Sequence, residues 1–430
     1  MSTGQSHGLS SSGLLPEETS SQAWGVTPWT AREHPRILVW TWTEPDKPSG
    51  SPAILREILR RIPGGRVEVV CQKNTTAERR LPIAWAHPIR RVAFHRWLRL
   101  FPRRLRIRSL ARYLFVLQCM LLYGLLRIRM WKPDCIYSIY MNDLWILSGY
   151  LLSRLTRIPI VYYVHDPYRE RAEFSKGLSR WIAAWLEPRA LRHGHILVLS
   201  ESLRERYLEQ YGIEATVVRQ LAGPPIAKRS AKGVPQHPPQ LVIGFSGLVY
   251  ANNHNQLRDL AEVCKRSECL RLRIWTGTRK SDLAEYGLLD ETVCVEFEKD
   301  NHRLITKLAE CHLLYLPLAF GGPGELPKSS LRYALPTKAV DYLRARVPIL
   351  VHCPADYELA RFFSRYQAAY HLAENSLKAL EQWFKQWREN RLEPIQDAAM
   401  EAALEAFCPE RNFQIHYQFL WDVSYPTRGD

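Results

Sequence analysis

The stretch that decides the fold runs from Gly321 to Val351 and reads GGPGELPKSSLRYALPTKAVDYLRARVPILV. Its centre indicates a loop that turns directly into a helix. Pro336 suits the first turn of a helix, where its missing N–H costs nothing. The apolar residues Ala339, Val340 and Leu343 would give that helix one buried side.

This loop-to-helix junction has the chemistry of an anion site. The free N–H groups and the dipole at a helix start attract negative charge, and Lys338 adds a full positive charge. Thr337 is predicted to cap the helix. An apolar strand over 347–351 follows, which would place the junction at the edge of a parallel sheet. An ordinary capped helix with a surface lysine is the alternative that the local pattern leaves open.

Three short motifs in this stretch carry a family resemblance. Pro336-Thr337-Lys338, then Asp341-Tyr342-Leu343, then Pro348-Ile349-Leu350 resemble the P-x-K-x-x-E-Y-L-A-x-G-x-P-V segment of retaining, nucleotide-sugar-dependent glycosyltransferases with the GT-B fold. The chain is similar to a divergent, family 4-like branch. The resemblance implies an α/β protein with two Rossmann-like, doubly wound parallel-sheet domains facing a cleft, and a C-terminal helix that crosses back.

Two positions depart from the family pattern. The family's glycine falls on Arg346, and the first of its paired acids falls on Tyr333. The second acid falls on Asp341, which the resemblance makes a contact to the ribose of the donor. A catalytically silent GT-B protein, a sugar-nucleotide-binding or scaffold subunit at a membrane, is therefore the alternative to an active enzyme.

Composition bounds the class of protein and its partners. A chain of 430 residues can form two domains with separate cores. The net charge of +16 and a pI near 9.5 favour an anionic partner such as membrane lipid, nucleic acid or a phosphorylated substrate. The nine cysteines include no CxxC pair, which favours a reducing cytosol over a disulfide or metal framework.

The chain divides at changes in composition. Residues 1–33 are polar, without a secretory signal, and predict a disordered tail. Residues 34–222 predict an acceptor-side Rossmann-like domain, and the Pro-, Gly- and Lys-rich stretch 223–240 predicts a linker. Residues 241–405 predict a nucleotide-sugar-binding Rossmann-like domain, and 406–430 a segment that packs back on the first.

Two features of the first half predict a ligand site at the edge of its sheet. An apolar strand over 158–164 ends in His165-Asp166, at the rim where parallel sheets bind ligands. Similar glycosyltransferases carry a histidine here that faces the sugar of the donor, so the resemblance makes His165 and Asp166, with Lys338, catalytic candidates. A structural histidine is the alternative. The loop after the first strand contributes Gly50 and Ser51 on the acceptor side.

The second half repeats the pattern of strand, glycine, loop and helix, which lets backbone approach a diphosphate closely. The family's arginine and lysine after Gly247 are absent, which leaves Lys338 as the main positive contact to the donor phosphates. No DxD-like sequence ends a strand, so we expect no essential metal and no cofactor beyond the nucleotide-sugar donor. The predicted donor-binding residues are Gly247, Asn253, Thr276, Ser329, Ser330, Thr337, Lys338 and Asp341.

Residues 79–112 are rich in arginine and interleaved aromatic side chains and contain no acid. This mixture is typical of a segment on anionic lipid, and a solvated basic face is the alternative. No nucleic-acid-binding signature accompanies it. The apolar run over 113–126 is shorter than the roughly twenty residues that span a bilayer. The predicted membrane contacts are Arg96, Trp97, Arg99, Arg103 and Arg104.

These observations predict a glycosyltransferase that moves a sugar from a nucleotide diphosphate to a hydroxyl group of a lipid-linked or membrane-borne glycan. Such an enzyme would synthesise a surface polysaccharide or glycolipid. We expect it in the cytoplasm, peripheral on the inner face of the membrane, with no nucleic-acid partner. A sugar-nucleotide epimerase shares the fold, but it would need acids and histidines converging from both domains.

Overall fold

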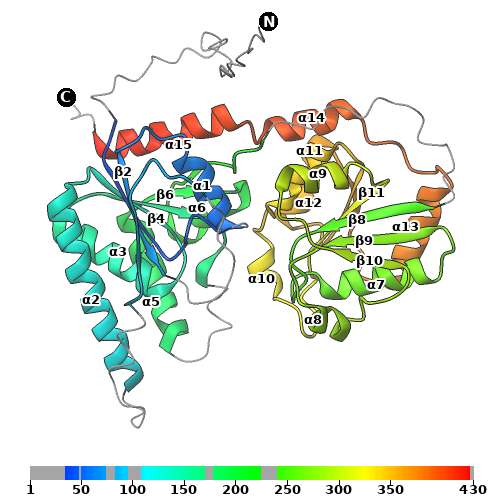
Figure 1. The fold of residues 1–430 in the computed structure, drawn as a ribbon, viewed down its shortest axis with the longest axis horizontal. Helices are drawn as coiled ribbons and strands as arrows, with labels where there is room; N and C mark the ends of the chain where they lie inside the picture. The colour runs from blue at the N-terminus through cyan, green and yellow to red at the C-terminus, as the bar shows by residue number, and fades with distance from the viewer. Residues whose placement is uncertain are drawn as a thin grey trace, which may run out of the picture. The chain divides into compact units, whose positions relative to one another are not determined.

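The computed structural model describes residues 34–47, 50–73, 83–94, 108–169, 178–223 and 240–426. Predictions on the tail, on most of the linker, and on Arg96, Trp97, Arg99, Arg103 and Arg104 lie outside these residues. The described chain forms two parallel sheets with helices between the strands (Figure 1). The predicted α/β class with two Rossmann-like sheets is confirmed.

The first sheet has the strand order β3-β2-β1-β4-β5-β6-β7, and all of its pairs are parallel. Its inner strands are buried along their whole length, as strands covered on both faces must be. The strands are β1 (Ile37–Thr41), β2 (Val67–Gln72), β3 (Ile89–Val92), β4 (Cys135–Ile139), β5 (Ile160–Val164), β6 (His195–Val198) and β7 (Thr216–Val217). The helices are α1 (Ser51–Leu59), α2 (Arg108–Trp131), α3 (Asp143–Thr156), α5 (Leu178–His193) and α6 (Glu201–Tyr211).

The second sheet repeats this order as β10-β9-β8-β11-β12-β13, again parallel throughout. The strands are β8 (Leu241–Ser246), β9 (Leu270–Trp275), β10 (Val293–Glu296), β11 (Leu313–Pro317), β12 (Ile349–His352) and β13 (Tyr370–Leu372). The helices are α7 (His254–Lys265), α8 (Lys280–Glu285), α9 (Asn301–Leu308), α10 (Lys328–Leu331), α11 (Lys338–Ala345), α12 (Glu358–Tyr366), α13 (Leu377–Arg388), α14 (Asp397–Glu405) and α15 (Pro409–Ser424).

The last helix returns to the first sheet, as the resemblance implied. On α15, the ring of His416 packs against Tyr137 of β4 and Tyr163 of β5. Just beyond the helix, the hydroxyl of Tyr425 donates a hydrogen bond of 3.1 Å to Asp134. The C-terminal helix therefore completes the core beneath the first sheet.

The structure corrects three local predictions. β3 and β13 are edge strands that the sequence analysis missed, and β3 lies inside the arginine-rich stretch. Thr337 has helical dihedral angles and makes no capping hydrogen bond with its side chain, so it is not a cap. The spacing of Trp181 and Trp185, one turn apart on a helix, predicts packing in the core, but both are exposed, Trp181 to 66%.

Helix α2 is longer than the apolar run that the sequence indicated. By length and composition, Tyr113–Trp131 is long and apolar enough to cross a membrane, and it is the one such span among the described helices. A third of that span is nevertheless buried in the protein, including Met120 and Ile128. Arg127 on the same helix is buried and donates two hydrogen bonds of 2.8 Å to Glu68 of β2. Helix α2 is therefore packed on the first sheet.

Candidate functional site

The strand order reverses direction at two places, between β1 and β4 and between β8 and β11. Doubly wound sheets bind ligands at such switch points, outside the carboxyl ends of the strands. The predicted site residues fall into two groups that follow these strands or their neighbours. One group follows β1 and β5, and the other follows β8, β9 and β11.

In the first group, the structure brings together two residues that are far apart in the sequence. Nδ1 of His165, just after β5, and the hydroxyl of Ser51, the first residue of α1, share a hydrogen bond of 2.7 Å. Gly50 precedes this helix with φ of 67°, a left-handed value that glycine adopts without strain. The turn at Gly50 therefore delivers Ser51 to the imidazole.

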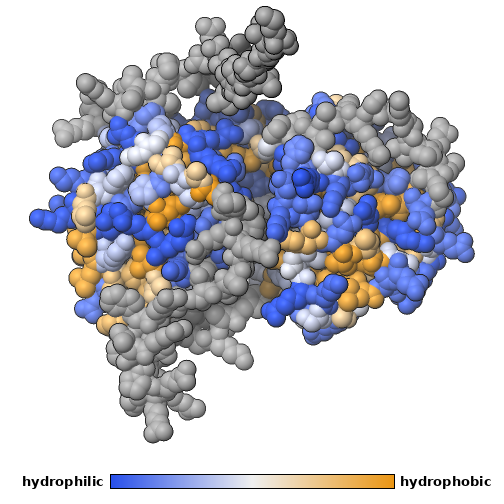
Figure 2. Space-filling model, viewed as in Figure 1, coloured by the Kyte–Doolittle hydropathy of each residue, from blue (hydrophilic) through white to orange (hydrophobic). Residues whose placement is uncertain are grey.

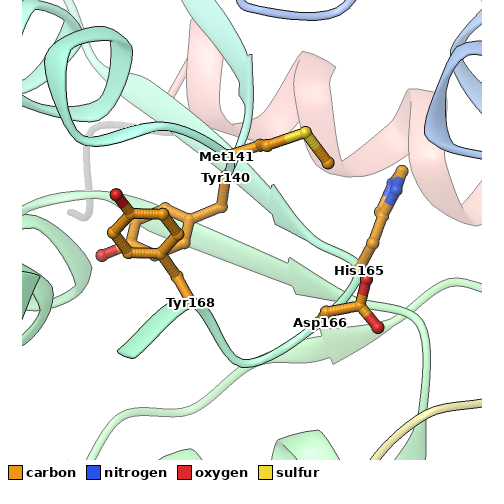
Figure 3. Close-up of a pocket in the computed structure, with 5 residues that line it drawn as sticks. All are labelled: Tyr140, Met141, His165, Asp166 and Tyr168. Atoms are coloured by element: carbon orange, nitrogen blue, oxygen red, sulfur yellow. The ribbon is translucent and has the colours of Figure 1, made fainter. Parts of the chain in front are cut away.

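His165 and Asp166 line a small hollow with Tyr140, Met141 and Tyr168. Figure 3 shows the side chain of Met141 extending toward His165, whereas the carboxylate of Asp166 points away from the imidazole. The His165 ring also packs edge-on against Tyr163, with 4.5 Å between ring centroids. His165 is thus held from two sides at the edge of the sheet.

The second group centres on Lys338, at the start of α11. Its ammonium lies 4.3 Å from the centroid of the Phe245 ring, beneath the end of β8. A Cβ atom on Gly247, which has φ of 120°, would lie 3.7 Å from Nζ. Among the described residues Lys338 has no carboxylate partner. Although the residue as a whole is partly exposed, burial of its ammonium lowers the pKa of Lys338 to about 7.

Asp341, one turn after Lys338, is held by its own surroundings. Its carboxylate accepts a hydrogen bond of 3.3 Å from Nδ2 of Asn301 and lies 3.5 Å from Nη1 of Arg344. Burial raises the pKa of Asp341, and these two neighbours oppose that rise. The carboxylate is therefore oriented toward Asn301 of α9 and toward Arg344, one turn later on α11.

Most of the other predicted donor residues shape loops. Asn253 is buried and holds the loop before α7, because its amide bonds the backbone of Leu248 and Tyr250. The Thr276 hydroxyl accepts a bond from the backbone N–H of Thr278. Ser330 bonds the carbonyl of Pro327, and Ser329 is exposed on the short helix α10.

Glu325 is a loop-forming residue that the sequence analysis missed. Its carboxylate accepts hydrogen bonds from the backbone N–H of Gly322 and from the side chains of Asn255 and Gln256. These bonds lower the pKa of Glu325 against the opposing effect of burial. The family pattern holds no signal for this residue, because its partners lie about seventy positions earlier in the chain and only the fold brings them near.

Tyr333, at the position of the family's first acid, contacts α6 instead of standing free. Its carbonyl accepts a hydrogen bond of 3.1 Å from the hydroxyl of Ser200, and its ring lies under the guanidinium of Arg206. Nearby, Nε2 of Gln220 donates a bond of 3.0 Å to the carbonyl of Thr337. Ser200 also caps α6, because its hydroxyl accepts a hydrogen bond from the backbone N–H of Leu203.

Among the described residues, no group of three His, Cys, Asp or Glu side chains could hold a metal ion.

Known proteins share one domain and the fold with this chain. Residues 28–223 match the model of the glycosyl transferase 4-like domain. A search of curated proteins gave no match. Solved structures with a similar fold include the sucrose-phosphate synthase of Thermosynechococcus elongatus, which is 12% identical with a TM-score of 0.64. The match covers 91% of this chain and 99% of the synthase chain.

Two further solved structures are similar over nearly their whole length. Anabaena Alr3699/HepE, in complex with UDP-glucose, is 14% identical with a TM-score of 0.60, and the match covers 90% of this chain and 99% of that one. WaaG, a glycosyltransferase involved in lipopolysaccharide biosynthesis, is 14% identical with a TM-score of 0.54, covering 91% and 100%. The domain match agrees with the predicted resemblance to a divergent, family 4-like glycosyltransferase over residues 28–223, and the solved structures share the fold of the chain.

Proposed function

We propose that this glycosyltransferase moves a sugar from a nucleotide diphosphate donor to a hydroxyl group of a lipid-linked or membrane-borne glycan, with retention at the anomeric carbon. The match to a glycosyl transferase 4-like domain and the UDP-glucose complex of the similar Anabaena protein support the donor class. The role of the similar WaaG in lipopolysaccharide biosynthesis supports a membrane-borne acceptor. The enzyme acts in the cytoplasm, peripheral on the inner face of the membrane.

Lys338 carries this proposal. A shielded ammonium without a carboxylate partner is costly, and a protein keeps one where a ligand supplies the missing charge. The donor diphosphate would lie between Lys338, the backbone at Gly247 and the start of α11. There the ammonium would stabilise the charge that develops on the leaving diphosphate, with no essential metal.

In this proposal His165 acts on the sugar and the acceptor, whereas Lys338 acts on the diphosphate. With Ser51 fixing one ring nitrogen, the imidazole presents its other side to the sugar of the donor and the incoming acceptor. Asp341 binds the ribose, and Gly50 and Ser51 lie on the acceptor side. Asp166 lines the hollow beside His165 and is the second catalytic candidate of the first domain.

Calorimetry with UDP and UDP-glucose tests the donor site. Lys338→Ala is expected to weaken binding by about 1.5–3 kcal/mol, because it removes one charge-assisted contact. Lys328→Ala, which removes an exposed lysine of the preceding helix, is the matched control and should leave binding unchanged. Equal affinities for wild type and Lys338→Ala would refute the assignment.

The pH dependence gives a second test of the same site. Because the pKa of Lys338 is about 7 without ligand, the lysine is largely neutral above that pH. A bound diphosphate raises this pKa, so binding takes up a proton and affinity falls by up to about tenfold per pH unit as pH rises above 7. Lys338→Ala should lose this slope, and a wild type without proton uptake at pH 8 would contradict the role.

A silent, sugar-nucleotide-binding subunit is the second candidate, and Tyr333 favours it. Both the carbonyl and the ring of Tyr333 are engaged with α6, so the position that carries an acid in the family offers none to the donor. Purified protein incubated with UDP-glucose, with and without a membrane fraction, decides between the two. Hydrolysis or transfer supports the enzyme, and tight binding without turnover supports the silent subunit.

Activity retained in EDTA supports the proposed independence from metal.

A further inference from the structure

Helix α2 has an inner side that is fully occupied by the protein. Val116 and Met120 are buried in the core of the first sheet. At Gly124 the helix approaches α3 so closely that an added Cβ would overlap the side chain of Leu152. Together with the buried pair of Arg127 and Glu68, these contacts hold α2 flat against the domain.

The outer side of α2 is apolar and uncovered among the described residues. Leucines and a methionine recur there at intervals of four or eight residues, which places them on a stripe that winds around the half of the helix opposite Val116 and Met120. They are half or more exposed, up to 64% for Leu122, and comprise Leu110, Leu114, Leu122, Leu126 and Met130. Figure 2 shows hydrophobic residues gathered along the edge of the molecule that α2 occupies in Figure 1.

The neighbouring helices extend this surface. Helix α3 packs between α2 and α5, and the hydroxyl of Ser153 bonds the ring of His193 at 2.9 Å. On α5 the exposed Trp181 and Trp185 lie one turn apart, and the guanidinium of Arg189 lies 4.6 Å from the Trp185 ring. Leu155 of α3 is 63% exposed. We call the solvent-facing side of α2, α3 and α5 the outer face.

The charge of the outer face has one sign. The acids in these helices are Asp143, at the start of α3, and Glu187, which is buried. Apart from these two acids, the described residues of the three helices include exposed charged side chains of one kind. They are arginines, among them Arg129, Arg154 and Arg192. The sequence that leads into α2, residues 95–107, also contains arginines and no acid. The outer face therefore complements an anionic, apolar partner.

We propose that the outer face is the docking surface for an anionic lipid bilayer, with α2 lying along the membrane and not through it. Leucines and tryptophans beside arginines, with no exposed acid, are the composition of an interfacial helix on anionic lipid. The leucines of α2 enter the boundary between headgroups and acyl chains, Trp181 lies at the headgroup level, and the arginines pair with lipid phosphates. This inference rests on the proposed membrane-borne acceptor and adds which face of the fold meets the lipid.

Vesicle co-sedimentation tests the docking surface. The probes are vesicles of phosphatidylcholine alone and of equimolar phosphatidylcholine and phosphatidylglycerol, at low and high salt. Leu122→Glu/Leu126→Glu should partition into anionic vesicles about tenfold or more weakly than wild type, because two apolar side chains are replaced by charges that lipid repels. Leu208→Glu/Leu289→Glu changes two equally exposed leucines away from the outer face and should bind as wild type does.

The proposal is overturned if wild type does not bind anionic vesicles, if it binds neutral vesicles equally well, or if both double variants lose binding equally. Resistance of the bound protein to alkaline extraction would also overturn it, because that indicates a spanning helix. A dimer that only Leu122→Glu/Leu126→Glu dissociates, with vesicle binding intact, would assign the face to a second copy and overturn it too. UDP binding by calorimetry separates this inference from the proposed function. If wild type binds UDP but does not bind anionic vesicles, the docking surface alone is refuted. If wild type does not bind UDP, the proposed function is refuted.

Discussion

Two histidines contact the same aromatic ring in the first domain, and their surroundings differ. His165 and His416 pack on Tyr163 with 4.5 Å and 5.5 Å between ring centroids. His165 follows a strand, lines a hollow and shares a hydrogen bond with Ser51. His416 lies on α15, is 1% exposed, and has no hydrogen-bond partner for either ring nitrogen among the described residues.

The comparison shows that burial alone does not identify a functional imidazole. Burial lowers the pKa of His416 to about 3, so the ring remains neutral and acts as a packing group between two tyrosines. His165 combines an oriented ring nitrogen with an opening toward the sheet edge, which a reacting group requires. The predictions below separate the two roles by substitution.

His165→Ala should have the largest effect. Removing one preorganised group beside the developing charge typically lowers kcat by about 10²-fold or more. UDP binding should change little, because the proposed contacts to the phosphates belong to the second sheet. Steady-state kinetics with a membrane acceptor measures the split, and His416→Leu serves as the control that keeps turnover. Loss of UDP affinity with kcat intact would reverse the assignment.

His416→Leu should stabilise the protein by about 1–2 kcal/mol at neutral pH, because an unsatisfied buried imidazole is replaced by an apolar group of similar size. In the unfolded chain the pKa of histidine is near 6.5, whereas the folded value is about 3. Between these values only the unfolded state binds the proton, so wild type loses up to about 1.4 kcal/mol per pH unit as pH falls below 6.5.

Chemical denaturation of wild type and His416→Leu between pH 7.5 and 4 measures this difference, and about 1.4 kcal/mol per pH unit is the most that one site can supply. The variant should show the shallower acid dependence. Parallel curves for the two proteins would mean that His416 gains a partner or remains protonated in the fold.

Ser51→Ala should have the smallest effect. It removes one hydrogen bond to Nδ1 of His165, which contributes about 0.5–1.5 kcal/mol, so kcat should fall by about tenfold at most. KM for the donor and the free energy of unfolding should stay close to wild type. Ser51→Thr keeps the hydroxyl and should restore kcat, and an equally impaired Ser51→Thr would argue for a packing role.

Much of the fold could be predicted because its elements are local patterns. Apolar runs such as those at β1, β5, β8 and β11 mark buried parallel strands, and Ser200 marks the start of α6. The short edge strands β3 and β13 were missed because their residues are only partly buried and carry no apolar run. Edge strands depend on the neighbour that they pair with, which is distant in sequence.

The arginine-rich stretch shows how tertiary structure changes the meaning of charge. Arg90 and Arg91 were predicted to belong to a face without acids, yet Arg90 pairs with Glu68 and Arg91 lies 2.7 Å from Asp46. These partners are supplied by β2 and by the loop after β1. The apolar and basic surface that the structure does expose lies on α2, α3 and α5 instead.

The tryptophans of α5 and the end of α11 also show that a local pattern does not determine the surroundings of a residue. Two tryptophans one turn apart lie on the same side of a helix, but their spacing does not show whether that side is buried or exposed. What covers that side depends on the elements that pack against the helix. Arg346, where the family has glycine, ends α11 with φ of 53° and pairs with Glu401 at 2.9 Å. A left-handed residue other than glycine costs about 1 kcal/mol, and the sequence alone could not show that the arginine adopts it.

The sequence by itself determined the α/β class, the repeated succession of strand, loop and helix, and the loop-to-helix junction at Lys338, since each rests on local patterns of residues. Only the tertiary structure decided which charged and polar groups are satisfied. Ser51 and His165 lie 114 positions apart, and Arg127 and Glu68 lie 59 apart. Local propensity does not reach across such separations. Burial and pairing are properties of neighbouring strands and helices, and these neighbours meet only when the sheets assemble.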